Sequence, residues 1–250
     1  MVDWDKYAEQ YDNITSSGFN PAYEEIQKKV YNFFVPKLKN QNKFVLDLCG
    51  GTGNFSIPLA FENPKCEFVI VDTSEKMLEK AIEKKQKFSL KNLNVIKEDV
   101  ENIEKICHQY SRPANDVLMI HGLYATKSKK DPQKPNRILK NIHSSLENYN
   151  SSLFISDINR QLKSYSWVPY CLWNAYKQTK SLTQTLKHFY FNDQAKKANK
   201  HLDLMQSSGE YLLCSLDEFV NMIEDAGFSK IFYKSDKFYR GRDNLVIAYK

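Results

Sequence analysis

The sequence predicts an α/β fold built on a doubly wound, seven-stranded sheet, because short apolar runs alternate along the chain with segments of helical period. The apolar runs are rich in Val, Ile, Leu and Phe. Several are apolar on both faces, which is typical of parallel strands covered by helices on either side. Alternation of this kind implies right-handed crossovers between the parallel strands. The first five predicted strands are residues 44–48, 68–72, 94–96, 116–120 and 153–157.

The last two strands, at 230–233 and 244–249, are predicted to pair antiparallel, because the residues between them are too few for a crossover helix. The sequence predicts a helix before these strands, with recognisable residues at both of its ends. Ser215 and Glu218 form a capping box at its start, and Gly227 is the residue type that commonly follows a helix C-terminus. We therefore expect the sheet to include an antiparallel last strand.

Two segments lie outside the strand–helix alternation. Residues 1–40 are predicted to form a helical lead-in, an N-terminal lid, and residues 160–210 a mostly helical insertion, a cap. No repeat, low-complexity tract or Pro/Gly linker divides the chain. We therefore expect one domain over residues 1–250 that carries both segments.

The composition, with 42% hydrophobic and 13% aromatic residues, is that of a chain with one sizeable core. The formal charge of +6 invites a nucleic-acid interpretation, but acids precede lysines at helical spacing, as on solvated helix faces. No run approaches the roughly 18 apolar residues of a membrane span, and the first residues lack the features of a signal peptide. Five scattered cysteines without a CxxC pair argue against a disulfide framework. We expect a cytoplasmic protein without a nucleic-acid partner.

The most informative segment is Val45–Phe55, in which an apolar strand carrying Asp47 leads into a glycine-rich turn at 50–53 and then a helix. Glycines let the backbone approach a ligand where a Cβ would clash. Asp72 ends the second strand nineteen residues after Gly53, where its carboxylate can take both hydroxyls of a ribose. The pattern indicates a nucleoside-type ligand at the carboxyl ends of the first two strands.

The turn also comes close to the dinucleotide fingerprint G-x-G-x-x-G/A, so an NAD(P)-linked oxidoreductase is the first alternative. Three features favour another nucleoside. Ser56 replaces the third glycine, and Asp47 suits a cationic amino group but would repel a pyrophosphate. The third strand also ends acidic, at Asp99, and Met77 is positioned to lie on a flat base.

The sequence resembles the class I S-adenosylmethionine-dependent methyltransferases, and more narrowly their small-molecule branch, which includes quinone-biosynthesis enzymes. The resemblance implies a Rossmann-like fold, S-adenosylmethionine as the cofactor and methyl transfer as the reaction. It covers well over half the chain. The segments that carry it are Val45–Ala60, Val69–Ala81, Asn94–Val100, Asp116–Tyr124 and the chain from Ser215 onward.

The resemblance also implies roles for single residues. Asp47 and the glycine turn would hold the methionine part of the cofactor, Asp72 would bind the ribose, and Met77 would pack on the adenine. Asp99 would meet the edge of the adenine, together with the residue after it. Tyrosines of the N-terminal lead-in would close over the cofactor. The cofactor-binding residues so implied are Tyr7, Tyr11, Asp47, Cys49, Gly50, Gly51, Gly53, Asn54, Asp72, Thr73, Met77, Asp99, Val100 and His121.

Some of these residues also have a purely structural interpretation. Asp72 and Asp99 can start the helices that follow them, Met77 can be a core residue, and the two tyrosines can form a packed helix face. Cys49 stands where the family usually has the first glycine of the turn. Because Cys is small, we expect only a local adjustment there.

The leading catalytic candidate is His121, directly after the fourth strand, where the family's acceptor meets the methyl group, and His188 is a second candidate. His121 can act as a general base or serve as a hydrogen-bonded wall residue. His121 also occupies the position of an expected acidic metal ligand, so we expect no catalytic metal. The motifs that mark amino-group methylation of bases and carbon methylation of cytosine do not follow this strand.

The predicted cap is rich in aromatic residues, which suits a pocket for a small molecule of aromatic or apolar character, although such residues also build a cap's own packing. A non-catalytic cofactor-binding interaction module is the second alternative function, because fold alone does not separate it from an enzyme. The candidate substrate-binding residues are Tyr124, Trp167, Tyr170 and Trp173.

Overall fold

The computed structural model describes residues 4–6, 8–15, 21–159 and 207–250, with a few isolated residues between 160 and 206. The described chain forms a seven-stranded sheet of order β3-β2-β1-β4-β5-β7-β6. All pairings are parallel except those of β7, which runs antiparallel to both β5 and β6. The predicted α/β fold with an antiparallel last strand is confirmed. The strands are β1 (Phe44–Leu48), β2 (Glu67–Asp72), β3 (Leu93–Lys97), β4 (Asp116–Ile120), β5 (Ser152–Ile158), β6 (Lys230–Lys237) and β7 (Asp243–Tyr249).

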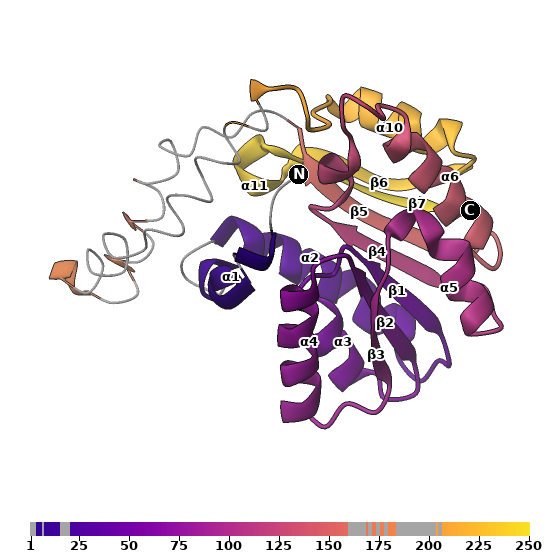
Figure 1. The fold of residues 1–250 in the computed structure, drawn as a ribbon, viewed down its shortest axis with the longest axis horizontal. Coiled ribbons are helices and arrows are strands. Elements are labelled where there is room, and N and C mark those ends of the chain that lie inside the picture. The colour runs from indigo at the N-terminus through magenta and orange to yellow at the C-terminus, as the bar shows by residue number, and fades with distance from the viewer. Residues whose placement is uncertain are drawn as a thin grey trace.

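Helices cover both faces of the sheet and make a three-layer arrangement (Figure 1). One face carries α2 (Pro21–Leu38), α3 (Ser56–Glu62) and α4 (Glu75–Lys87). The opposite face carries α5 (Ile103–Gln109), α6 (Lys134–Ser145) and α10 (Leu216–Asp225). The short elements are η1 (Trp4–Lys6), α1 (Ala8–Thr15), η2 (Val100–Asn102), η3 (Leu123–Thr126) and α11 (Phe238–Gly241).

The sheet separates two apolar clusters, so its central strands are apolar on both faces. Their sequences are therefore continuous apolar runs. Every residue of β1 and β4 is buried, and so is every residue of β5. Phe34 of α2 packs against Phe154 of β5 on one face, whereas Leu46 and Ile103 belong to the cluster on the other face. Burial on both faces removes the alternation that a half-exposed strand would show.

The helix boundaries follow the local signals in the sequence. Ser74 is the N-cap of α4 and accepts a hydrogen bond from the backbone N of Met77. Ser215 and Glu218 form the predicted capping box of α10, and Gly227 follows that helix with φ +111°. These caps satisfy backbone groups that a helix end leaves without partners.

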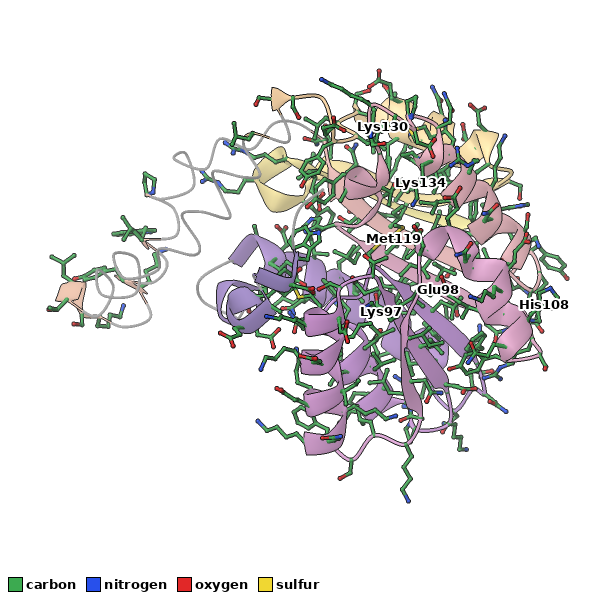
Figure 2. The ribbon with its side chains drawn as sticks, in the orientation of Figure 1. Lys97, Glu98, His108, Met119, Lys130 and Lys134 are labelled. Atoms are coloured by element: carbon green, nitrogen blue, oxygen red, sulfur yellow. The ribbon has the colours of Figure 1, made fainter. Side chains whose placement is uncertain are left out.

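The order of the strands reverses between β1 and β4, so their carboxyl ends face a crevice at the switch point. The η1 segment lies at this edge, where Asp5 accepts a hydrogen bond from Ser74 at the start of α4. Figure 2 labels Glu98, which follows β3, Lys134, the first residue of α6, and Met119 of β4. Most of the predicted cap, with Trp167, Tyr170 and His188, falls outside the described residues, as does Tyr7.

No helix in the described ranges combines the length and apolar character that a membrane crossing requires.

Candidate functional site

A cleft opens at the carboxyl ends of β1 to β4 and encloses about 920 Å³ without protein atoms, counting space open to solvent. Its lining comes from all four strand ends, from α4 and α6, and from the N-terminal segment. Nine of its lining residues were predicted from the sequence to bind the cofactor: Tyr11, Cys49, Gly51, Asp72, Thr73, Met77, Asp99, Val100 and His121. Six were not predicted: Trp4, Ile120, Gly122, Ala125, Thr126 and Lys134.

The glycine turn after β1 shapes one wall of the cleft. Gly51 has φ +53°, and a Cβ built on it would meet no atom within 4 Å, so the backbone here borders open space. Gly53 has φ +76°, and its Cβ would lie 2.7 Å from Ile70 and 2.8 Å from Ile57. Gly53 is therefore required for packing under the turn, whereas Gly51 leaves room for a ligand at the backbone.

Asp72 presents its carboxylate to the cleft from the end of β2. One oxygen accepts a hydrogen bond from the backbone N of Gly51 at 3.0 Å, and the other from Ser74 at 2.9 Å. Burial raises the pKa of this carboxyl, although the backbone hydrogen bonds oppose that effect. Each oxygen keeps capacity for a second hydrogen bond. Asp72 is thus held with both oxygens able to accept from a diol.

Asp47 lies beneath the turn rather than in the cleft lining. It is buried, and it accepts a hydrogen bond from Ser56 Oγ at 2.5 Å. Burial raises its pKa to about 7. Asn54 turns away from the cleft and contacts Thr15 and Lys84. Four predicted cofactor contacts therefore stand behind the lining: Asp47, Gly50, Gly53 and Asn54.

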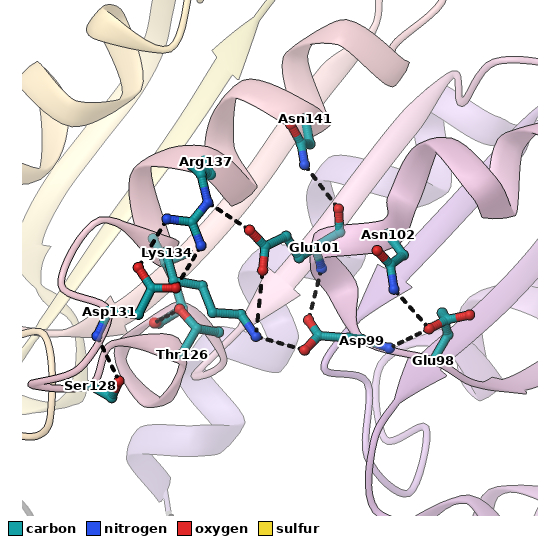
Figure 3. Close-up of polar contacts among 11 residues, drawn as sticks. Glu98, Asp99, Glu101, Asn102, Thr126, Ser128, Asp131, Lys134, Arg137 and Asn141 are labelled. Atoms are coloured by element: carbon teal, nitrogen blue, oxygen red, sulfur yellow. Dashed lines mark hydrogen bonds and ion pairs between the residues drawn. The ribbon is translucent and has the colours of Figure 1, made fainter.

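The far end of the cleft lies beside β3. Met77 is buried at the base of α4 and lines this end. Asp99 caps η2 by accepting a hydrogen bond from the backbone N of Glu101. Its other oxygen pairs with Lys134 Nζ at 2.6 Å (Figure 3). This end therefore combines the apolar side chain of Met77 with the ion pair of Asp99 and Lys134.

His121 follows β4 directly and has φ +52°, a conformation that is uncommon for a residue with a side chain. Its Nε2 lies 3.0 Å from an oxygen of Asp243, which is fully buried at the start of β7. That same oxygen accepts a hydrogen bond from Ser156 Oγ. Burial alone would lower the pKa of His121, but the Asp243 carboxylate outweighs it, so the pKa is raised.

The N-terminal segment closes one side of the cleft through Trp4 and Tyr11, whose rings meet edge to face. Two carboxylates anchor this segment. Asp5 accepts from the Ser74 hydroxyl at 2.6 Å, and Asp12 accepts from Thr52 Oγ1 at 2.6 Å. The predicted lead-in is therefore tied to both the glycine turn and α4.

Two candidate substrate residues lie in the described ranges, and neither lines the cleft. The ring of Tyr124 is buried edge-on against Tyr211, and its backbone N donates to Asp157 at 2.6 Å. The side chain of Trp173 is exposed and stacks on Tyr176.

The cleft lining holds two aspartates, Asp72 and Asp99, and one lysine, Lys134, which pairs with Asp99. Besides burial, four aspartates raise the pKa of the Cys49 thiol at the end of β1, namely Asp72, Asp157, Asp99 and Asp47. A ligand with net positive charge would relieve this repulsion, whereas a pyrophosphate would add to it. Within the described ranges, no group of three or more His, Cys, Asp or Glu side chains is placed to hold a metal ion.

The fold and the cleft define a Rossmann-like protein with a ligand-sized cleft at the switch point of its sheet, where proteins of this fold commonly bind nucleotides. A family profile described as a methyltransferase domain matches residues 39–230. The chain therefore belongs to this family, the class I S-adenosylmethionine-dependent methyltransferases that the sequence resembles. S-adenosylmethionine is the cofactor of this class, as predicted.

Individual relatives are more distant. The ribosomal RNA small subunit methyltransferase G of Nitrosococcus oceani is 30% identical over 92 residues, which are 37% of this chain and 42% of that protein. The chain thus matches less than half the length of this relative. Magnesium protoporphyrin IX methyltransferase from Synechocystis PCC 6803, solved with bound SAH, has a TM-score of 0.63 at 14% identity, covering 98% of this chain and 97% of its own. A Nostoc punctiforme PCC 73102 protein assigned as an O-methyltransferase has a TM-score of 0.60 at 18% identity, covering 99% of this chain and 60% of its own.

Proposed function

We propose that this protein transfers the methyl group of S-adenosylmethionine to a small molecule of aromatic or apolar character. The observation that carries the cofactor assignment is the cleft itself: Asp72 offers two oriented carboxylate oxygens inside a half-enclosed space. The cofactor has a cationic sulfonium and an amino group, so this charge favours it over NAD(P). The NAD(P)-linked alternative is correspondingly weaker, because its pyrophosphate would face the same carboxylates.

The proposed binding mode follows the lining from one end to the other. Asp72 accepts hydrogen bonds from the two ribose hydroxyls, and Gly51 lets the methionine part pass close to the backbone. Met77 packs against the adenine, and Asp99 with Val100 meets its edge. Asp47 and Gly50 act from behind the turn, where the Asp47 carboxyl, once it is ionised, favours the cationic end.

The reaction is a direct displacement, for which the bound cofactor supplies the activated methyl group. The protein's part is to align the acceptor and exclude water, which Trp4 and Tyr11 do from the lid side of the cleft. His121 is the proposed general base, and Asp243 orients its ring through Nε2. A non-catalytic binding module would have no use for a general base, so this role for His121 favours an enzyme over that alternative.

We propose that catalysis uses no divalent metal, because His121 stands where a metal-dependent enzyme would need a hard oxygen ligand. Full activity after chelation is the expected result. Loss of activity in EDTA that magnesium restores would contradict this part of the proposal.

The lid of residues 1–40 and the cap of residues 160–210 are proposed to enclose the acceptor within a single domain that acts in the cytoplasm. The four described cysteines are all free thiols, which agrees with a reducing compartment. Trp4 and Tyr11 supply aromatic surface at the cleft from the lid side. The proposed acceptor contacts are Tyr124, Trp167, Tyr170 and Trp173.

The acceptor class is tested by supplying methyl-tritiated S-adenosylmethionine with separate metabolite, RNA and protein fractions of a cell extract. We expect the label to appear in the metabolite fraction and to partition into organic solvent. The His121→Ala variant and a reaction without extract serve as controls. Label in the RNA fraction would contradict the proposal and favour the chemistry named in the ribosomal RNA methyltransferase relative.

A further inference from the structure

Asp99 and Lys134 form an ion pair inside the cleft lining, from two elements that are distant in sequence. Asp99 directly follows β3, and Lys134 is the first residue of α6. Lys134 Nζ lies 2.6 Å from Asp99 Oδ2, while Asp99 Oδ1 accepts a hydrogen bond from the backbone N of Glu101 at 2.9 Å. The protein thus holds each of the two oxygens at one point, and both residues border the cleft.

Lys134 is itself held in place by its surroundings. Its side chain is only 20% exposed, and its ammonium also lies 3.7 Å from Glu101 Oε2. Arg137 bonds the other oxygen of Glu101 at 2.7 Å and makes a two-pronged pair with Asp131. Figure 3 shows Lys134 reaching between Asp99 and Glu101, with Arg137 on the outer side.

This network restrains the rotation of the Asp99 carboxylate, since a turn about its terminal torsion would break the contacts on both oxygens. Each oxygen of a carboxylate can accept about two hydrogen bonds, so one anchor on each oxygen leaves acceptor capacity toward the cleft. An acceptor held in this way favours an amino group and opposes a carbonyl oxygen, because two acceptors facing each other stay unpaired.

We propose that Lys134 is a positioning residue of the cofactor cleft, which holds Asp99 so that its carboxylate accepts a hydrogen bond from the 6-amino group of the adenine. The inference rests on the proposed binding mode. It adds the residue that makes the cleft select a purine with an amino group at position 6 over one with a carbonyl oxygen there. Lys134 is the first residue of α6. Ala125 and Thr126 of the preceding η3 line the same cleft.

The test compares two ligands by calorimetry: S-adenosylhomocysteine and its 6-oxo analogue, in which inosine replaces adenosine. The unaltered protein is expected to prefer the 6-amino ligand. In Lys134→Met, that preference should shrink about three- to tenfold, because Asp99 loses the anchor on one oxygen while the ribose contacts stay. Asp99→Asn should shrink it too, since an amide can also donate to a carbonyl. The double variant should show no further reduction.

Lys105→Met is the matched control, because Lys105 pairs with Glu98, the neighbour of Asp99, at 2.6 Å but does not line the cleft. Its ligand preference should stay unchanged. Thermal unfolding verifies that each variant is folded, and Lys134→Gln replaces Lys134→Met if the latter is not. Equal weakening of both ligands in the Lys134 variant, or no change in either, would overturn the inference alone. Failure of the unaltered protein to bind S-adenosylhomocysteine would overturn the cofactor assignment as well.

Discussion

Cys49 and Gly122 touch across the ends of β1 and β4, and a Cβ placed on Gly122 would lie 2.6 Å from Cys49 Cβ and 2.9 Å from its Sγ. Both residues border the cleft. Cys49 has φ +56°, a conformation that usually belongs to glycine. The Cys49 side chain therefore fits at this turn because Gly122, which follows β4, has no side chain.

The first prediction follows from this contact. Gly122→Ala should destabilise the protein by about 1–3 kcal/mol, as overpacking of a tight contact commonly does, and should weaken S-adenosylhomocysteine binding. Cys49→Gly should restore most of the loss in the double variant, because it removes the side chain that the new methyl group meets. Urea unfolding of the two single variants and the double variant measures this. Additive losses would show that the two positions do not share space.

The second prediction concerns the proton on Asp47. Its pKa of about 7 lies above the ordinary 3.8, so the folded protein holds this proton while the unfolded chain has lost it. Below about pH 3.8 both states hold the proton, and the contribution of Asp47 to stability is complete. That contribution is lost as the pH rises from about 3.8 through about 7, because the unfolded chain ionises more readily than the folded protein. Asp47→Asn should therefore flatten the pH dependence of the free energy of unfolding between pH 4 and 7.

The same proton should be released when the cationic cofactor binds, because a positive ligand favours the ionised carboxylate. Calorimetry at pH 7 in two buffers of different ionisation enthalpy measures this release. We expect more release with S-adenosylmethionine than with the uncharged sulfur of S-adenosylhomocysteine, and little with Asp47→Asn. If Asp47→Asn released as many protons as the unaltered protein on binding the cofactor, the released proton would come from another group.

The third prediction concerns His121, whose pKa Asp243 raises above the ordinary value of about 6.5. The stability from this pair is complete below about pH 6.5 and is lost as the pH rises through the folded pKa. If His121 is the base, methyl transfer should increase over that same range, as the ring loses its proton. Asp243→Asn should shift both the imidazole titration seen by NMR and the rate profile to lower pH. A rate profile that stayed in place while the NMR titration moved would exclude His121 as the base.

The fourth prediction concerns Trp173. Because its side chain is 57% exposed, Trp173→Ala should cost little stability, well below the roughly 3–5 kcal/mol of a buried aromatic. We expect a higher KM for the acceptor or a lower kcat, with cofactor affinity within a few-fold of the unaltered value. Lost cofactor binding with intact acceptor affinity would contradict the proposal that Trp173 serves the acceptor and not the cofactor.

The fold was predictable because buried parallel strands and capped helices leave local signals, as in Val45–Leu48 and at Ser215. Asp72 was predictable from its distance to the glycine turn, which the strand–turn–helix geometry constrains. Asp47 was expected to hold the methionine part of the cofactor together with the glycine turn; in the structure it lies in β1, and its burial under Gly50 depends on packing that no local pattern reports.

The cleft residues that the sequence did not reveal come from contacts between distant elements. Lys134, which lines the cleft, and Asp243, which contacts the lining residue His121, have no periodic or motif signal, because each acquires its partner only when separate elements meet. Trp4 belongs to a recognised aromatic lead-in, yet its place in the cleft depends on the anchoring of Asp5 to Ser74. Pairings of this kind require the tertiary structure.

The central claim is that Asp72 binds the ribose of S-adenosylmethionine in this cleft, and calorimetry with S-adenosylhomocysteine tests it most directly. Two charge-assisted hydrogen bonds of about 1.5–3 kcal/mol each would be lost in Asp72→Ala. The account predicts saturable binding by the unaltered protein, weakened roughly tenfold to several hundredfold in the variant. An unchanged dissociation constant in a folded Asp72→Ala protein, or tighter binding of NADH than of S-adenosylhomocysteine, would contradict it.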